Sequence, residues 1–283
     1  MIYITYACVK NKKIKDAVHE LAENGFKNIE LSGGTEYYEN FESDLLNLKK
    51  KYNLNYLCHN YFPPPKTPFV LNLASLNDET FEMSFNHLQK VIRLSEELGA
   101  AKFGFHAGFF IDIKLNEIGK KLSKDNLFDE KKAVKRFCNA FEIIKKDAKN
   151  LSLFIENNVF SKSNAITYDG EKPFMMTSFS DYKSLKKKID FNLLLDVAHL
   201  KVSVKTMGLN WEDEFKNMMS VSSYIHVSDN DGFHDLNNEL CKKSDLLSML
   251  KEINTTDKDF TLEIYDGIEA IKKSHTVLSE AVL

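Results

Sequence analysis

The stretch FNLLLDVAHL, residues 191–200, decides how the rest of the chain is interpreted. Its apolar run suits a buried strand, but the run ends in Asp196, and His199 follows three residues later. A strand that ends in a carboxylate and an imidazole can deliver metal ligands at its carboxyl end. Taken alone, an aspartate after a strand is more often a turn former or the N-cap of a helix. The interpretation therefore depends on whether other strands end in the same way.

Short apolar runs recur along the 283 residues, with amphipathic segments between most of them. The runs lie at residues 2–7, 28–33, 55–60, 102–108, 153–158, 192–197, 224–229 and 260–265. The helical patterns lie at residues 14–24, 41–52, 79–99, 130–150, 181–189, 211–219 and 245–253. Gly25 and Gly99 stand where helix C-caps are expected. Eight apolar strands alternating with helices predict an α/β fold, a single-domain (β/α)8 TIM barrel over residues 1–283.

A doubly wound sheet is the structural alternative to the barrel. Such a fold places a glycine-rich phosphate loop after its first strand. The segment YACVKNKK at residues 6–13 contains no glycine, so the barrel is favoured.

The composition limits the compartment and the partners. No apolar run approaches the ~20 residues that cross a membrane, and the four cysteines show no CxxC spacing, which indicates a reducing cytoplasm. The net charge is −3, and the only arginines are Arg93 and Arg136. Because arginine provides the bidentate contacts to phosphate and guanine, nucleic acid is a less expected partner. The sequence does not indicate an oligomeric state.

Ionisable side chains also end most of the other predicted strands. They are His59, His106, Glu156, Asp196 with His199, His226, and Glu263. Each one alone is better explained as a hydrogen-bonded core residue or a salt-bridge partner. In a parallel barrel, however, the carboxyl ends of all strands meet on one face, and carboxylates gathered there repel one another unless a cation lies between them. The joint pattern therefore predicts a divalent metal site, and its oxygen-rich ligands suit Mn²⁺, Mg²⁺, Co²⁺ or Zn²⁺.

Two connections are longer than ordinary loops between strands and helices, at residues 61–78 and 109–129. In a barrel they would rise over the carboxyl face, where substrates bind.

Short motifs follow one another along essentially the whole chain. They are NIEL at 28–31, HNY at 59–61, NLAS at 72–75, FHAG at 105–108, IENN at 155–158, DVAH at 196–199, HVSDNDG at 226–232 and LEI at 262–264. In this order the chain resembles the xylose isomerase-like TIM-barrel superfamily. That superfamily contains metal-dependent sugar isomerases and epimerases, and also apurinic-site endonucleases of the endonuclease IV type.

The resemblance implies a core metal held by the quartet Glu156, Asp196, His226 and Glu263. It also implies that Glu156 and Glu263 form the acid/base pair that removes and returns a proton beside a metal-polarised carbonyl. His199 matches a substrate contact in the epimerases and a metal ligand in the endonucleases.

The endonuclease branch uses three zinc ions, and this chain matches much of that set. The resemblance implies His59 and His106 for a second metal, and His199 and Asp235 for a third. The usual Asp-x-His motif is here DLN at residues 235–237, so its histidine is missing. His234, which directly precedes the aspartate, is the candidate replacement.

The sequence thus predicts a divalent-metal-dependent isomerase or epimerase acting on a small-molecule sugar or sugar phosphate. The alternative is an endonuclease IV-like phosphodiesterase using two or three zinc ions. A binding module that has lost its metal is a third interpretation, and the two glutamates Glu156 and Glu263 argue against it.

Overall fold

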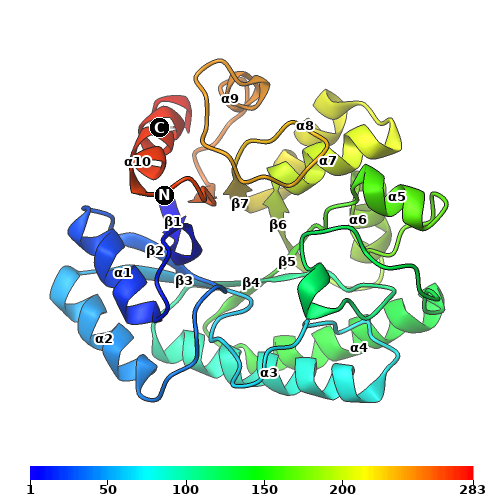
Figure 1. The fold of residues 1–283 in the computed structure, drawn as a ribbon, viewed down its shortest axis with the longest axis horizontal. Helices are drawn as coiled ribbons and strands as arrows, with labels where there is room; N and C mark the ends of the chain where they lie inside the picture. Colours follow the sequence, from blue (N-terminus) through cyan, green and yellow to red (C-terminus); the bar gives the residue numbers. More distant parts are fainter. Residues whose placement is uncertain (283) are drawn as a thin grey trace.

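The eight apolar runs form parallel strands that close into a barrel in the computed structural model, which describes residues 1–282. The strands pair in chain order, and β8 pairs back with β1. They are β1 (Ile2–Thr5), β2 (Asn28–Leu31), β3 (Asn55–His59), β4 (Lys102–His106), β5 (Ser152–Glu156), β6 (Asn192–Asp196), β7 (Ser222–Val227) and β8 (Asp259–Leu262). Figure 1 shows them as an inner ring with the helices outside. The predicted (β/α)8 TIM barrel is confirmed.

The helices cover the outer surface of the barrel. They are α1 (Ile14–Glu23), α2 (Phe41–Tyr52), α3 (Asp78–Glu97), α4 (Glu130–Asp147), α5 (Lys162–Thr167), α6 (Phe179–Lys186), α7 (Val197–Met207), α8 (Trp211–Val221), α9 (Asp245–Leu250) and α10 (Ile268–Val282), with 3-10 turns η1 (Tyr6–Cys8) and η2 (Leu115–Glu117). Gly25 and Gly99 follow α1 and α3 with φ angles of +90° and +66°, as expected of C-cap glycines. Across residues 1–282, no helix combines the length and apolar character needed to span a bilayer.

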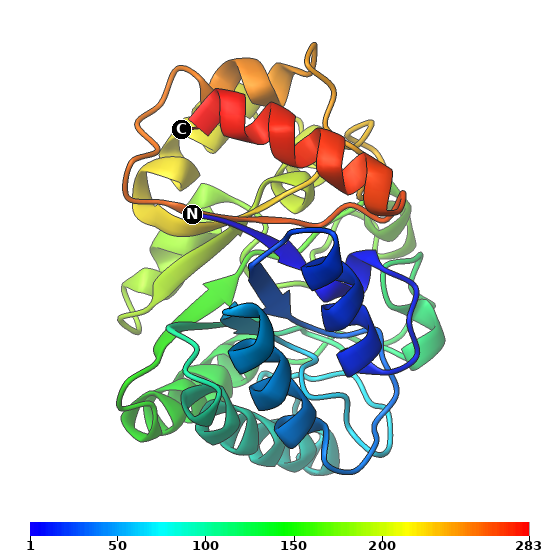
Figure 2. The same ribbon diagram turned by 90° about the vertical axis from the view of Figure 1, so that its left-hand side faces the viewer.

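Three of these helices, α5, α7 and α10, are absent from the sequence prediction. Helix α7 follows β6 without a loop, because Asp196 is both the last strand residue and the N-cap of the helix. Helix α10 is amphipathic, buries its apolar face and lies beside β1 (Figure 2).

The interior of the barrel has an apolar layer beneath an ionisable one. Leu57, Phe154, Leu194 and Tyr224 pack together with Tyr3 inside the barrel. Successive side chains of a strand point to opposite faces, so a residue two positions later points inward as well. These later residues are His59, Glu156, Asp196 and His226. Strand periodicity therefore places four ionisable side chains inside the barrel near its carboxyl end, next to an apolar layer.

Gly104 of β4 leaves the space that two interior side chains occupy. A Cβ atom at this position would lie 2.7 Å from Leu194 Cδ2 and 2.8 Å from His59 Cδ2. Both distances are shorter than real Cβ contacts, so a side chain here would displace the His59 ring or Leu194.

We expect Gly104→Ala to lower the free energy of unfolding by about 1–3 kcal/mol, because overpacking a close-packed interior forces side chains from their rotamers. Urea unfolding measures the change. Gly33→Ala is the matched control, since its added Cβ would make an ordinary contact, 3.6 Å from Tyr61. Equal losses of stability in the two variants would contradict the steric explanation.

Candidate metal centre

A cavity of about 820 Å³ opens at the carboxyl face of the barrel. Its ionisable lining includes His59, His106, Glu156, His199, Asp235 and Glu263. Its walls include Tyr61 and Val70 from one long connection and Phe109, Ile113 and Leu122 from the other. Both connections therefore rise over this face, as the sequence predicts.

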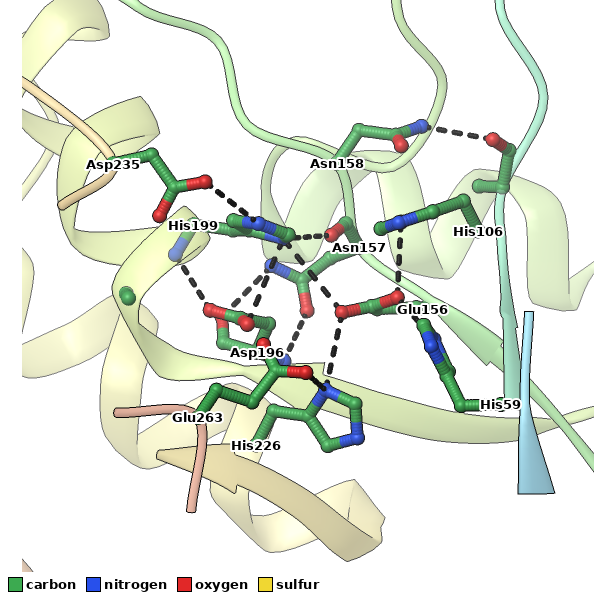
Figure 3. Close-up of polar contacts among 12 residues, drawn as sticks. His59, His106, Glu156, Asn157, Asn158, Asp196, His199, His226, Asp235 and Glu263 are labelled. Atoms are coloured by element: carbon green, nitrogen blue, oxygen red, sulfur yellow. Dashed lines mark hydrogen bonds and ion pairs between the residues drawn. The ribbon is translucent and has the colours of Figure 1, made fainter. Parts of the chain in front are cut away.

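One ring nitrogen of His226, near the end of β7, faces the carboxylates of Glu156 and Glu263 (Figure 3). Its Nδ1 atom lies 3.5 Å from Glu156 Oε1 and 3.4 Å from Glu263 Oε1. Within residues 1–282 this buried nitrogen has no hydrogen-bond partner. Two ligand atoms bound ~2.1 Å from one ion at a tetrahedral angle lie roughly 3.4 Å apart. The Nδ1 atom of His226 therefore lies at the spacing of a shared ligand shell from each of the two carboxylate oxygens.

Glu156 ends β5 and presents each of its oxygens to different imidazoles. Its Oε2 lies 2.7 Å from His59 Nε2 and 2.9 Å from His106 Nδ1, whereas its Oε1 faces His226. Burial opposes ionisation of this carboxyl, but the charges of His106 and His59 outweigh burial and hold its pKa well below the usual range. Both oxygens of Glu156 therefore have imidazole neighbours that are themselves potential metal ligands.

His199, in the first turn of α7, has a partner on each ring nitrogen. Its Nδ1 lies 3.0 Å from the carbonyl oxygen of Asn157, and its Nε2 lies 3.2 Å from Asp235 Oδ2. Burial lowers the pKa of this imidazole, but Asp196 and Asp235 outweigh burial and raise the pKa well above its ordinary value. Asp235 Oδ1 is buried without a hydrogen-bond partner in the described chain. This pair can contact either a substrate or a cation.

Asp196 is the N-cap of α7, because its Oδ1 accepts a hydrogen bond of 2.7 Å from the backbone N–H of His199. Its Oδ2 lies 3.9 Å from His199 Nδ1. Burial raises the pKa of this carboxyl, and Glu156 and Asp235 add to the rise while His199 opposes it. A carboxylate can cap a helix with one oxygen and bind a cation with the other, so the role of Asp196 as a ligand stays a prediction.

Glu263 lies one residue past β8, not inside the longer strand that the sequence predicts. Its backbone N–H donates to the carbonyl oxygen of Val227 at 3.1 Å, which holds the residue beside β7. Burial raises the pKa of its carboxyl to about 8, with further increases from Asp196 and Glu30 against a decrease from His226.

His234, the candidate replacement for the missing histidine, lines the cavity with Asp235 but pairs with a different aspartate. It is exposed, and its Nδ1 lies 2.9 Å from Asp231 Oδ2. Asn237 is buried and lines the cavity with Asp235.

Residues 1–282 contain three groups of side chains whose ligand atoms lie within 4.8 Å of one another. They are His59 with Glu156 and His226, His106 with Glu156 and His199, and Glu30 with His226 and Glu263. The groups share members, so they are parts of one site. Mixed imidazole and carboxylate donors suit Zn²⁺, Mn²⁺ and Co²⁺.

Glu30 is the site residue that the sequence prediction missed. It lies in β2, is fully buried, and its Oε2 lies 2.8 Å from His226 Nε2. An ionisable side chain inside an apolar strand is the signal that identified the other residues, and NIEL at 28–31 carries it. The sequence prediction used NIEL only as a motif of the family resemblance and gave Glu30 no role in the site.

A sequence profile of the xylose isomerase-like TIM barrel family matches residues 18–281, and the chain belongs to this family. The predicted resemblance is confirmed. Comparison with curated protein sequences gives no significant match.

Solved structures of similar fold include an epimerase-like protein, an epimerase and an endonuclease. A D-tagatose 3-epimerase-like protein matches with a TM-score of 0.74 and 15% identity, covering 99% of this chain and 96% of that chain. The D-allulose 3-epimerase from Methylomonas sp. has a TM-score of 0.69 and 10% identity, with coverage of 99% and 96%. Endonuclease IV from Thermus thermophilus has a TM-score of 0.62 and 14% identity, with coverage of 99% of both chains. At these identities the matches show the shared fold.

Glu263→Gln should change how the stability of the metal-free protein depends on pH. The folded protein holds the Glu263 proton up to about pH 8, whereas the unfolded chain releases it near the ordinary pKa of 4.5. Between these values the folded state binds more protons at this group, so its contribution makes the free energy of unfolding fall as pH rises. Glutamine cannot ionise and removes this fall.

Urea unfolding of chelator-treated protein at pH 5 and pH 8 measures the effect, and wild type should lose more stability than Glu263→Gln. Glu156→Gln is the control of opposite sign, because the depressed pKa of Glu156 stabilises the fold above its ordinary pKa. Glu156→Gln should therefore be less stable than wild type at pH 8. An identical pH dependence in wild type and Glu263→Gln would refute the assignment.

Proposed function

We propose that this protein is a divalent-metal-dependent isomerase or epimerase of a sugar or sugar phosphate. The observation that supports it most is the unpartnered Nδ1 of His226, which faces carboxylate oxygens of Glu156 and Glu263 at ligand spacing within the described residues. The site opens into a cavity whose volume lies within the range of small-molecule sites. The epimerases among the solved structures of similar fold agree with this proposal.

The proposed ligands are Glu156, Asp196, His226 and Glu263. A cation held there would stabilise the negative charge that develops on a substrate carbonyl oxygen during proton abstraction. Any one of Mn²⁺, Mg²⁺, Co²⁺ and Zn²⁺ fits this donor set.

Glu156 and Glu263 are the proposed acid/base pair. One carboxylate removes a proton from the carbon beside the carbonyl, and the other returns a proton to the opposite face or to the neighbouring carbon. Their environments differ, because the pKa of Glu156 is depressed while that of Glu263 is about 8. A pair with separated proton affinities suits these complementary roles. His199, which pairs with Asp235, is the proposed contact to a substrate hydroxyl.

Glu156→Gln and Glu263→Gln should each reduce turnover by about 100-fold or more, since a positioned acid or base contributes roughly 10²–10⁴-fold. The measurement is conversion of ketoses and ketose phosphates with added Mn²⁺ or Co²⁺, followed together with deuterium incorporation from solvent. Glu269→Gln is the control, because Glu269 is an exposed member of a surface ion pair and should keep wild-type turnover. Full sugar turnover in both site variants would exclude the proposed mechanism.

A second candidate function is an endonuclease IV-like phosphodiesterase. The contact of His59 and His106 with one oxygen of Glu156 favours it, because a second cation there would complete a two-metal clamp for attacking and leaving oxygens. Against it stand Asn237 at the position of the missing histidine and the scarcity of arginine.

The deciding assay is incision of duplex DNA that contains an abasic site, at physiological salt, with and without EDTA. Our proposal predicts no efficient nicking. Efficient nicking that EDTA abolishes would replace the sugar enzyme with the phosphodiesterase.

A further inference from the structure

Glu30 is a carboxylate buried inside the barrel, below the cavity and away from substrate. It is fully buried and, among residues 1–282, does not line the cavity. Its ion-pair partner there is His226. Such a group is costly to bury, so its hydrogen bonds must offset the loss of hydration.

Three donors converge on one oxygen of this carboxylate. Glu30 Oε2 accepts hydrogen bonds from the Tyr224 hydroxyl and, at 3.0 Å, from the Thr261 hydroxyl. His226 Nε2 lies 2.8 Å from the same oxygen. An oxygen that accepts from both hydroxyl groups has no proton of its own to donate, so His226 Nε2 must carry the hydrogen.

This hydrogen bond decides which nitrogen of His226 is free to bind a cation. A neutral imidazole carries its hydrogen on one nitrogen and a lone pair on the other. In the neutral ring with its hydrogen on Nε2, the lone pair of Nδ1 would point toward Glu156 and Glu263, which lie 3.5 and 3.4 Å away. Glu156 and Glu263 thus face Nδ1, whereas Glu30 faces Nε2.

We propose that Glu30 is a positioning residue that fixes the orientation and tautomer of His226, so that Nδ1 is presented as a metal ligand. This inference rests on the proposed function, because it assigns a role within the same metal site. It assigns no contact with substrate to Glu30. The Tyr224 and Thr261 hydroxyls in turn hold the Glu30 carboxylate in place.

Glu30→Gln should weaken metal binding by about 10- to 100-fold, the usual effect of removing the carboxylate behind a ligating histidine. The amide keeps the size of the side chain but loses its charge, and it can turn a donor toward Nε2. Co²⁺ binding to the chelator-treated full chain, followed by visible absorption and by competition with a chelator, measures the affinity. Wild-type affinity in Glu30→Gln would overturn the proposal.

Asp259→Asn is the matched control for loss of a partly buried carboxylate. Asp259 begins β8 at the other end of the barrel, where its carboxylate pairs with Lys102 and the N-terminus and, among the described residues, forms no hydrogen bond or ion pair with His226. Its variant should keep the wild-type affinity for Co²⁺. An equal loss in both variants would mean that Glu30 acts through general stability, which contradicts a positioning role.

The tautomer of His226 is a second readout, independent of affinity and of turnover. In ¹⁵N-histidine NMR of the Zn²⁺-loaded wild type, we expect the His226 signals of a metal-bound Nδ1 and a protonated Nε2, assigned with His226→Gln. The reverse pattern would overturn the proposal even if Glu30→Gln failed to fold. If wild type bound none of Mn²⁺, Mg²⁺, Co²⁺ and Zn²⁺, the proposed function itself would fail. If wild type bound a cation and Glu30→Gln bound it with equal affinity, only the positioning role of Glu30 would be contradicted.

Discussion

The site depends on one constraint, the burial of the Glu156 carboxylate among histidines that different strands deliver. Glu156 is 1% exposed, and its two oxygens face His59 and His106 on one side and His226 on the other. A buried carboxylate is tolerated only where positive charge or hydrogen-bond donors replace water. Every imidazole that meets this demand is also a potential metal ligand. The histidines that stabilise the charge of Glu156 are therefore the same residues that form the candidate metal centre.

The barrel supplies this arrangement through strand geometry. Parallel strands bring their carboxyl ends together on one face of the barrel. Because every second side chain of a strand points inward, the apolar interior layer is followed, two residues later, by a layer of ionisable side chains. Leu194 and Asp196 illustrate the step on one strand, as Tyr224 and His226 do on another. Glu30 interrupts the pattern, because it places a carboxylate behind the histidine instead of in front of it. The site therefore has an outer set of groups that faces the cavity and an inner carboxylate that does not.

Much of this could be predicted from the sequence, because apolar runs and their charged ends are local features. FNLLLDVAHL predicts both a strand and a ligand pair, and the structure adds that Asp196 caps α7 through His199. Helix α7 was missed since no turn residues separate it from β6. The partner of each imidazole nitrogen could not be predicted, because Glu30 and His226 are 196 residues apart and meet only when the barrel closes.

The most direct test is the thermal stability of chelator-treated protein with and without Mn²⁺, Co²⁺ or Zn²⁺, measured in parallel on His226→Ala. A ligand at 100 times its dissociation constant stabilises the folded state by roughly 2.7 kcal/mol. We predict that at least one of these cations raises the midpoint of wild type by several degrees and leaves His226→Ala unchanged. A wild-type midpoint that none of the cations raises would contradict the metal centre.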